Sequence, residues 1–283
     1  MLTLLTGIAI IVLFALRPFV NKKSSRELPP AVASYFSSFY CMVLIIPTIP
    51  LFWEYFFIKE SFVFLNPWIL VPIVKGVSIY TQIKFLQTIN KESTSSSAFW
   101  GVIGLAIGAI VTTLIFGSDI SLNKLIIIIS IGIIGTLFFT IGEGRTLSAT
   151  GKKAFCIVVI CGAANTFCDV TGIKYLNWYV LLTVTCVSMF LCSFLANHNT
   201  IKIKELIKTK HLVIAGLTFA LGDFVLMFSM QSFFPVLAAL FLIRVAQSID
   251  IVAAHHIYKE GKPELQYFFG LGTIAIAYFF YFG

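Results

Sequence analysis

The chain has 283 residues, of which 59% are hydrophobic and 11% are charged, and its net charge is +8. This composition excludes an ordinary soluble domain, because a surface that faces water needs more polar cover. A bundle of helices in a bilayer tolerates it, since the outer surface of the bundle faces lipid. The basic residues gather between apolar segments, so the net charge is not a sign of nucleic-acid binding.

Ten apolar segments follow one another along the chain, each near the length of about 20 residues that crosses a bilayer as a helix. They are residues 3–20, 31–55, 68–89, 98–116, 122–141, 154–173, 178–196, 212–232, 236–258 and 265–282. None alternates apolar and polar residues as barrel strands do. The sequence therefore predicts an all-α integral membrane protein with ten transmembrane helices joined by short loops, the longest at 21–30 and 197–211.

Basic residues are divided unequally between the loops. Loops after even-numbered segments hold only Lys59, Lys124 and Lys174. Loops after odd-numbered segments hold fourteen, namely Arg17, Lys22, Lys23, Arg26, Lys91, Arg145, Lys152, Lys153, Lys202, Lys204, Lys208, Lys210, Lys259 and Lys262. Because cytoplasmic loops carry the excess of Lys and Arg, we expect a multi-pass protein of the plasma membrane (the inner membrane in bacteria) with both termini outside the cytoplasm.

The two halves of the chain, residues 1–150 and 151–283, repeat one pattern of five segments. A shift of 142 residues places 68–89 on 210–231 and 115–124 on 257–266. An odd number of spans inverts the second copy in the membrane. Inverted repeats are typical of secondary transporters, whose substrate site lies near the membrane midplane where the repeats meet.

Each half ends in the same way, with a long segment, a short polar turn and a final segment that contains glycine. The turns read Phe116-Gly-Ser-Asp119 and Lys259-Glu260-Gly261. With five plus five spans, the chain resembles the drug/metabolite transporter superfamily, in its EamA-type ten-helix branch. The resemblance implies a basket-like bundle that moves small metabolites by alternating access. The chain lacks the proline that is common in the fourth and ninth helices of that branch.

Polar and ionisable side chains inside the predicted spans are the candidates for a substrate site. Such groups are costly in hydrocarbon unless they meet a partner, water or a ligand. The candidates come from both halves and are Lys75, Ser78, Gln82, Trp100, Asn165, Asp169, Asp223, Met227, Met230, Arg244, Gln247 and Ser248. Several share a helix face, as Lys75, Ser78 and Gln82 do.

The chemistry of these side chains suggests a solute that carries charge. A carboxylate at Asp223, beside Met227 and Met230, could receive a cationic or amphipathic ligand. Burial favours the protonated form of a carboxyl group, so Asp223 is also the candidate for proton coupling. Arg244 could bind a carboxylate or phosphate through its planar fork. A site with both signs of charge suits a zwitterion, although Asp223 could instead pair with Lys75 or Arg244.

Other kinds of site are absent from the sequence. No Gly-x-x-x-x-Gly-Lys-Ser/Thr loop occurs, so transport is expected without ATP, and we expect no cofactor. Adjacent residues of a helix point to different faces, so His255 and His256 do not predict a metal site. The roles of these histidines and of Asp250 stay open at this point.

The sequence therefore predicts a secondary transporter of a small polar or amphipathic organic metabolite, such as an amino acid or amine, and not an enzyme. Its expected partners are that solute, the lipid bilayer and a coupling proton or cation, with no nucleic acid. Two alternatives stay open. One is a non-transporting scaffold or assembly subunit, which would bury its charges as pairs without a cavity. The other is an intramembrane enzyme that uses Asp250 with His255 and His256, or Asp223.

Overall fold

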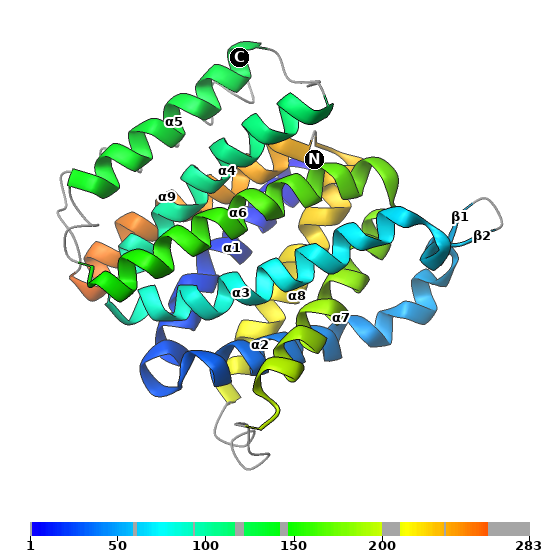
Figure 1. Cartoon of the computed structure of the whole chain (residues 1–283), viewed down its shortest axis with the longest axis horizontal. Helices are drawn as coiled ribbons and strands as arrows, with labels where there is room; N and C mark the ends of the chain where they lie inside the picture. The colour runs from blue at the N-terminus through cyan, green and yellow to red at the C-terminus, as the bar shows by residue number, and fades with distance from the viewer. Residues whose placement is uncertain are drawn as a thin grey trace.

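The computed structural model describes residues 2–58, 61–92, 94–116, 122–141, 147–199, 210–234 and 236–259. Within these ranges the chain forms nine α-helices (Figure 1). They are α1 (Leu2–Glu27), α2 (Pro30–Ile45), α3 (Leu70–Glu92), α4 (Thr94–Phe116), α5 (Leu122–Ile141), α6 (Ala149–Tyr175), α7 (Trp178–Asn197), α8 (Lys210–Ser232) and α9 (Val236–Tyr258). The tenth predicted span, 265–282, lies outside the described residues.

The helices coincide with the first nine apolar segments, but α1 is longer than predicted. It continues seven residues past residue 20 and ends at Glu27. The predicted loop at 21–30 therefore shrinks to Leu28 and Pro29, which precede α2. Arg17 and Lys22 consequently belong to a helix, and their assignment to a loop was wrong. The side chain of Lys22 is buried, and its Nζ donates to the carbonyl oxygen of Asn90 at 2.6 Å.

Five helical segments in the described part of the chain are long and apolar enough to cross a membrane. They are Pro30–Phe56, Pro67–Glu92, Ala149–Tyr175, Trp178–Asn197 and Leu212–Ser232. Large apolar side chains on the outside of the bundle stay exposed, such as Leu114 at 79% and Ile160 at 68%. Contact with lipid gives these side chains an apolar environment. The protein is therefore a helical membrane protein.

The second predicted span, 31–55, is not one α-helix. After Ile45 the chain continues as a 3₁₀-helix, η1 (Ile46–Phe56), with a kink at Phe52. Pro47 and Pro50 lie in this stretch, and proline lacks the amide hydrogen that an α-helix requires. A two-residue antiparallel hairpin follows, β1 (Phe57–Ile58) with β2 (Ser61–Phe62), in which Phe57 faces Phe62.

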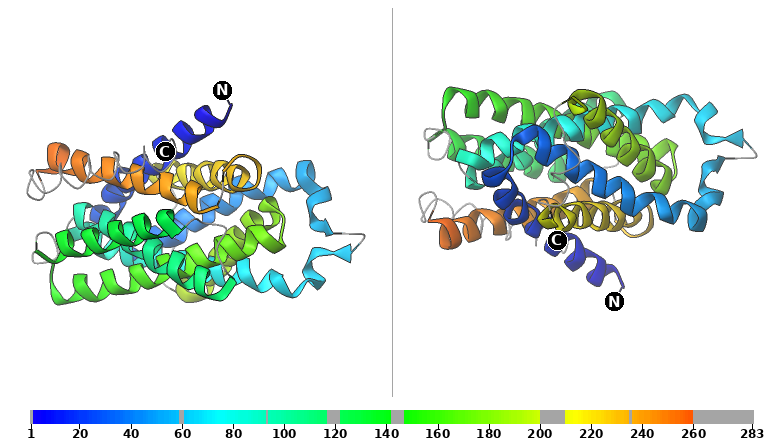
Figure 2. Two further views of the ribbon diagram at one scale, coloured as in Figure 1. Left: turned by 90° about the horizontal axis from the view of Figure 1, so that it is seen from above. Right: turned by 90° about the horizontal axis from the view of Figure 1, so that it is seen from below.

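Two further 3₁₀ turns, η2 (Val63–Leu65) and η3 (Pro67–Ile69), lead from this hairpin into α3. The hairpin was not expected in an all-α chain. It projects from one end of the bundle (Figures 1 and 2).

Side-chain caps set where α6 and α7 begin. Ser148 precedes α6, and its hydroxyl accepts a hydrogen bond from the amide of Gly151 at 3.0 Å. Asn177 precedes α7, and its Oδ1 accepts from the amide of Tyr179 at 2.9 Å. These bonds satisfy amides that have no partner in the first helical turn. Glu92, at the end of α3, accepts from both the amide and the hydroxyl of Ser148. The end of α3 is thereby joined to the start of α6.

Helices of the two halves interleave rather than forming two separate bundles. Helix α3 packs against α6 and α7, α1 packs against α8 and α9, and α4 packs against α6 and α9. These contacts come in corresponding pairs, in which each helix of one half is replaced by the helix five places away in the other half. In this way α3–α6 corresponds to α8–α1, α4–α6 to α9–α1, and α3–α7 to α8–α2. Most of the core therefore lies between the halves.

Among the described residues, helix ends and connections gather at two ends of the bundle. The α1–α2 connection, the end of α3 and the last turn of α9 lie at one end, and the β1–β2 hairpin lies at the other (Figure 1). Lys91, Lys152, Lys153 and Lys259 all belong to helix ends or connections at the first end. Lys174 stands at the opposite end of α6. The basic residues that the structure describes are thus concentrated at one end.

Glycines allow the closest approach between helices. A Cβ on Gly76 of α3 would lie 2.7 Å from both the amide nitrogen of Met189 and the carbonyl oxygen of Thr185 in α7. A Cβ on Gly108 of α4 would lie 2.9 Å from a carbonyl oxygen of α6. Backbone atoms cannot turn aside as a side chain can. These two glycines are therefore required by packing, as small residues are in many membrane bundles.

Gly76→Ala should lower the stability of the protein. Alanine favours a helix by up to about 1 kcal/mol over glycine, but the clash with the α7 backbone costs about 1–3 kcal/mol. We expect a lower midpoint of thermal unfolding in detergent. Gly7→Ala is the control, because its Cβ would meet side chains at an ordinary 3.7 Å. Equal midpoints for the two variants would contradict the role given to Gly76.

Candidate functional site

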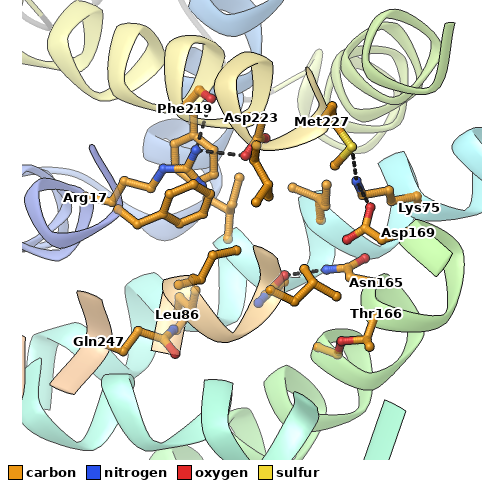
Figure 3. A pocket seen from close by; sticks show the side chains of 18 of the residues that line it. Arg17, Lys75, Leu86, Asn165, Thr166, Asp169, Phe219, Asp223, Met227 and Gln247 are labelled. Carbon is orange, nitrogen blue, oxygen red and sulfur yellow. Dashed lines mark hydrogen bonds and ion pairs between the residues drawn. The ribbon is translucent and has the colours of Figure 1, made fainter. Parts of the chain in front are cut away.

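A cavity of about 150 Å³ lies between helices of both halves (Figure 3). An apolar cavity of similar volume in another protein holds a molecule of benzene, so this one has room for a small solute. Its lining comes from α1, α3, α6, α8 and α9 and consists of Phe14, Arg17, Lys75, Ile79, Gln82, Ile83, Leu86, Asn90, Gly162, Asn165, Thr166, Asp169, Phe219, Asp223, Leu226, Met227, Leu240, Ile243, Gln247 and Asp250.

An ion pair between Arg17 and Asp223 joins α1 to α8 at the cavity. The guanidinium Nη2 donates to Oδ1 of Asp223 at 2.8 Å, and the two side chains are only 11% and 18% exposed. The same nitrogen donates to the carbonyl oxygens of Thr218 and Phe219 at 3.3 and 3.0 Å. The two hydrogens of Nη2 are shared among these three acceptors, and the bond to the carboxylate is charge-assisted and therefore the strongest. Arg17 is therefore firmly fixed to α8.

Aromatic rings and a glycine complete the surroundings of Arg17. Its guanidinium lies over the ring of Phe14 at 3.7 Å and over the ring of Phe219 at 4.2 Å. Both rings attract the cation through their negative faces. A Cβ on Gly222 would lie 2.5 Å from Nη2, so the absence of a side chain there makes room for the guanidinium. Figure 3 shows Arg17 directed from α1 toward Asp223.

A second ion pair, Lys75 with Asp169, joins α3 to α6. The Nζ of Lys75 donates to Oδ1 of Asp169, and both side chains are buried. The thioether sulfur of Met227, on α8, lies 3.9 Å from the same nitrogen. The cation of Lys75 thus has a carboxylate on one side and a soft, polarizable atom on the other.

The two ion pairs are arranged in the same way. In each, the cation comes from the first half of the chain and the carboxylate from the second. The pairs lie at the α1–α8 and α3–α6 contacts, which correspond to each other when helix numbers change by five. Both therefore hold the two halves together around the cavity.

Uncharged polar groups continue the α3–α6 contact. The Nδ2 of Asn165 donates to Oε1 of Gln82 at 2.6 Å, while its own Oδ1 has no hydrogen-bond partner in the described part of the chain. Ser78 donates to the carbonyl oxygen of Cys161 at 3.1 Å. Gln82 and Asn165 therefore line the cavity as a bonded pair, and Ser78 is engaged in the helix contact beside it.

One face of α9 closes the cavity. Leu240, Ile243, Gln247 and Asp250 recur at helical spacing and all line it. The side chain of Asp250 is 1% exposed, and neither carboxylate oxygen has a hydrogen-bond partner in the described part of the chain. Asp250 thus shares the face of Gln247. Three residues separate the two, which puts them on adjacent turns.

The structure brings together seven of the twelve candidate residues from the sequence. They are Lys75, Gln82, Asn165, Asp169, Asp223, Met227 and Gln247. Two others, Ser78 and Met230, are not among the lining residues, and Met230 packs in the hydrophobic core. The side chains of Trp100, Arg244 and Ser248 lie outside the described residues.

Arg17 lines the cavity, although it was not among the candidates from the sequence. Its position inside the apolar segment 3–20 could have marked it as a site residue. Basic residues are also common where a span meets a cytoplasmic loop, and Arg17 lies near the end of that segment. The structure pairs Asp223 with Arg17, and Lys75, one of the two partners that the sequence had suggested, pairs with Asp169 instead. Phe14, Asn90 and Phe219 also line the cavity without having been selected.

No cluster of three or more His, Cys, Asp or Glu side chains suited to a metal ion occurs among the described residues. Within that part of the chain the carboxylates of the cavity come singly from different helices. His256 is exposed, and the side chain of His255 lies outside the described residues.

Comparison with other proteins gives a fold but no family. No family model matches the sequence, and no curated protein matches it. Twenty-eight chains of solved structures match the fold. One, a crystal structure of a protein with 12% sequence identity, aligns with a TM-score of 0.66 over 98% of this chain and 96% of its own. At this identity the likeness shows a shared fold alone.

Removing one partner of the Lys75–Asp169 pair should destabilise the protein strongly. Lys75→Met and Asp169→Asn each leave a buried charge without its ion-pair partner, which costs about 3–5 kcal/mol. The double variant removes both charges and should recover most of that loss. Chemical denaturation in detergent micelles measures all four proteins. Additive losses in the double variant would show that the two charges do not depend on each other.

Proposed function

We propose that the protein is a secondary transporter of a small polar or amphipathic organic solute, such as an amino acid or amine. The observation that carries the proposal is the cavity between the two halves, lined by charges of both signs. Midplane sites between helices of two repeats are where such transporters bind their substrates. The resemblance to the ten-helix drug/metabolite transporters points the same way.

The ion pairs give alternating access a physical basis. Arg17–Asp223 and Lys75–Asp169 both cross from one half to the other, so a rocking of one half against the other would stretch or break them. A charged solute in the cavity could replace the lost partner of each group. Motion of the halves and binding of the solute would then be coupled through the same four side chains.

An inverted repeat with ten spans is part of this proposal. It is supported by helix contacts that recur when helix numbers change by five, and by described helix ends that lie at opposite ends of the bundle. The basic end would face the cytoplasm, which places the start of α1 outside. We propose a plasma membrane location, the inner membrane in bacteria, on the same charge asymmetry.

A scaffold or assembly subunit is the second candidate. The pairing of four buried charges favours it, because purely structural charges should be paired. The cavity and the unpaired carboxylate of Asp250 favour transport instead, since a structural role explains neither. An intramembrane enzyme has less support, because the described cavity carboxylates stand on three different helices.

Uptake into proteoliposomes tests the proposed function. We expect saturable uptake of at least one member of a panel of radiolabelled amino acids and simple primary amines. Asn165→Trp should fill the cavity and lower that uptake at least about tenfold, equivalent to roughly 1.4 kcal/mol. Ile160→Trp, on the exposed side of the same helix, is the matched control and should transport normally. No uptake of any member, or equal uptake by both variants, would argue against transport through this cavity.

Cysteine labelling tests the orientation. In a cysteine-free background, Leu65→Cys near the hairpin should react with a membrane-impermeant maleimide on intact cells. Thr150→Cys, exposed at the basic end, should react only after the membrane is permeabilised. The expectation follows from the excess of basic residues on the cytoplasmic side. The reverse labelling pattern would invert the proposed topology.

A further inference from the structure

Asp250 is a buried acidic group that the ion pairs of the cavity do not use. Its side chain is 1% exposed, it lines the cavity, and neither of its oxygens has a hydrogen-bond partner in the described part of the chain. An ionised carboxylate buried without a partner costs many kcal/mol. Something must therefore neutralise it, either a proton or a cation that enters the cavity.

The described cations near the cavity are already engaged elsewhere. On α1, Arg17 is bound to Asp223, and Lys22 donates to the carbonyl of Asn90. On α3, Lys75 is bound to Asp169 of α6. Helix α4 also packs on α9, and its sequence contains no ionisable residue.

The described lining thus holds two cations and three carboxylates, which leaves one negative charge without a counterpart. On α8 the facing acid is Asp223, already paired. On α9 itself, His256 is exposed at the basic end, and the side chains of Arg244 and His255 are outside the described residues.

Several residues that line the cavity have buried side-chain oxygens without a hydrogen-bond partner in the described part of the chain. These are the Oδ1 atoms of Asn90 and Asn165 and both oxygens of Asp250, and the corresponding nitrogen is Nε of Arg17. An ammonium group has three donors and no acceptor. The lining therefore matches a solute that brings a positive charge and hydrogen-bond donors together.

We propose that Asp250 is the carboxylate that receives the ammonium group of the solute, with Asn90 and Asn165 supplying further acceptors in the same cavity. The inference rests on the proposed function and names the substrate class as small primary amines, including amino acids. Asp223 is less suited to this role, because a solute would first have to displace Arg17 from it. In the empty cavity a proton neutralises Asp250, so protons compete with the amine.

Binding of benzylammonium to the purified full-length protein tests the assignment, because its ring matches the volume of the cavity. Benzyl alcohol and benzoate keep the ring and replace the ammonium with a neutral and an anionic group. By calorimetry we expect benzylammonium to bind at least about tenfold more tightly than either analogue. Its affinity should fall as the pH is lowered, because binding of the ammonium group releases the proton that neutralises Asp250 in the empty cavity.

Asp250→Asn should remove the preference for the amine over the alcohol and the pH dependence together. Glu54→Gln, which removes an exposed carboxylate outside the cavity, is the control and should bind like the parent protein. If Asp223→Asn has the predicted effect and Asp250→Asn has none, the ammonium site is at Asp223 and the assignment is wrong. The analogue series and the pH series use the unaltered protein, so they decide the question even if Asp250→Asn does not fold.

Binding and uptake together distinguish an error in the role of Asp250 from an error in the proposed transport function. Tight binding of benzylammonium that depends on Asp250, without uptake of any amine or amino acid, would contradict transport and leave the site standing. Uptake of a solute that the Asp250→Asn variant transports normally would support transport and contradict the role given to Asp250. Equal binding of benzylammonium and benzyl alcohol by the unaltered protein would also overturn the assignment.

Discussion

Charge buried inside a lipid-embedded bundle is the constraint on which this structure depends. Each of Arg17, Lys75, Asp169 and Asp223 would be prohibitively costly alone, and each is stable because its partner comes from the other half of the chain. The helix contacts that carry these pairs, α1–α8 and α3–α6, are therefore fixed by electrostatics as well as by shape. The cavity is the space that these two contacts leave between them.

Close packing at glycines positions the helices so that the charged side chains can meet their partners. Helix α3 lies against the backbone of α7 at Gly76, while its Lys75 reaches α6 one residue earlier. On α8, Gly222 leaves room for Arg17 beside Asp223. Small residues thus do more than let helices approach, because they set the register at which long cationic side chains meet their carboxylates.

The positions of the helices could be predicted from the sequence, whereas the partners in the site could not. Apolar length and turn residues are local signals, so the bounds of α5 and α9 agree with the predicted segments. The kink in η1 was missed because an apolar run conceals the missing amide hydrogens of Pro47 and Pro50. Arg17 and Asp223 are 206 residues apart, and no spacing within one sequence relates them.

The division of charge between the halves has a consequence for how the protein is made. Both cations lie in the half that leaves the ribosome first, and both carboxylates that neutralise them are synthesised later. During biogenesis the cations of α1 and α3 therefore lack their partners until α6 and α8 have been synthesised. Until then they need a polar environment, such as the lipid headgroups, water-filled insertion machinery or a chaperone. Assembly of the bundle is then bound to completion of the chain, and an amino-terminal fragment released early would carry two unneutralised positive charges into the bilayer.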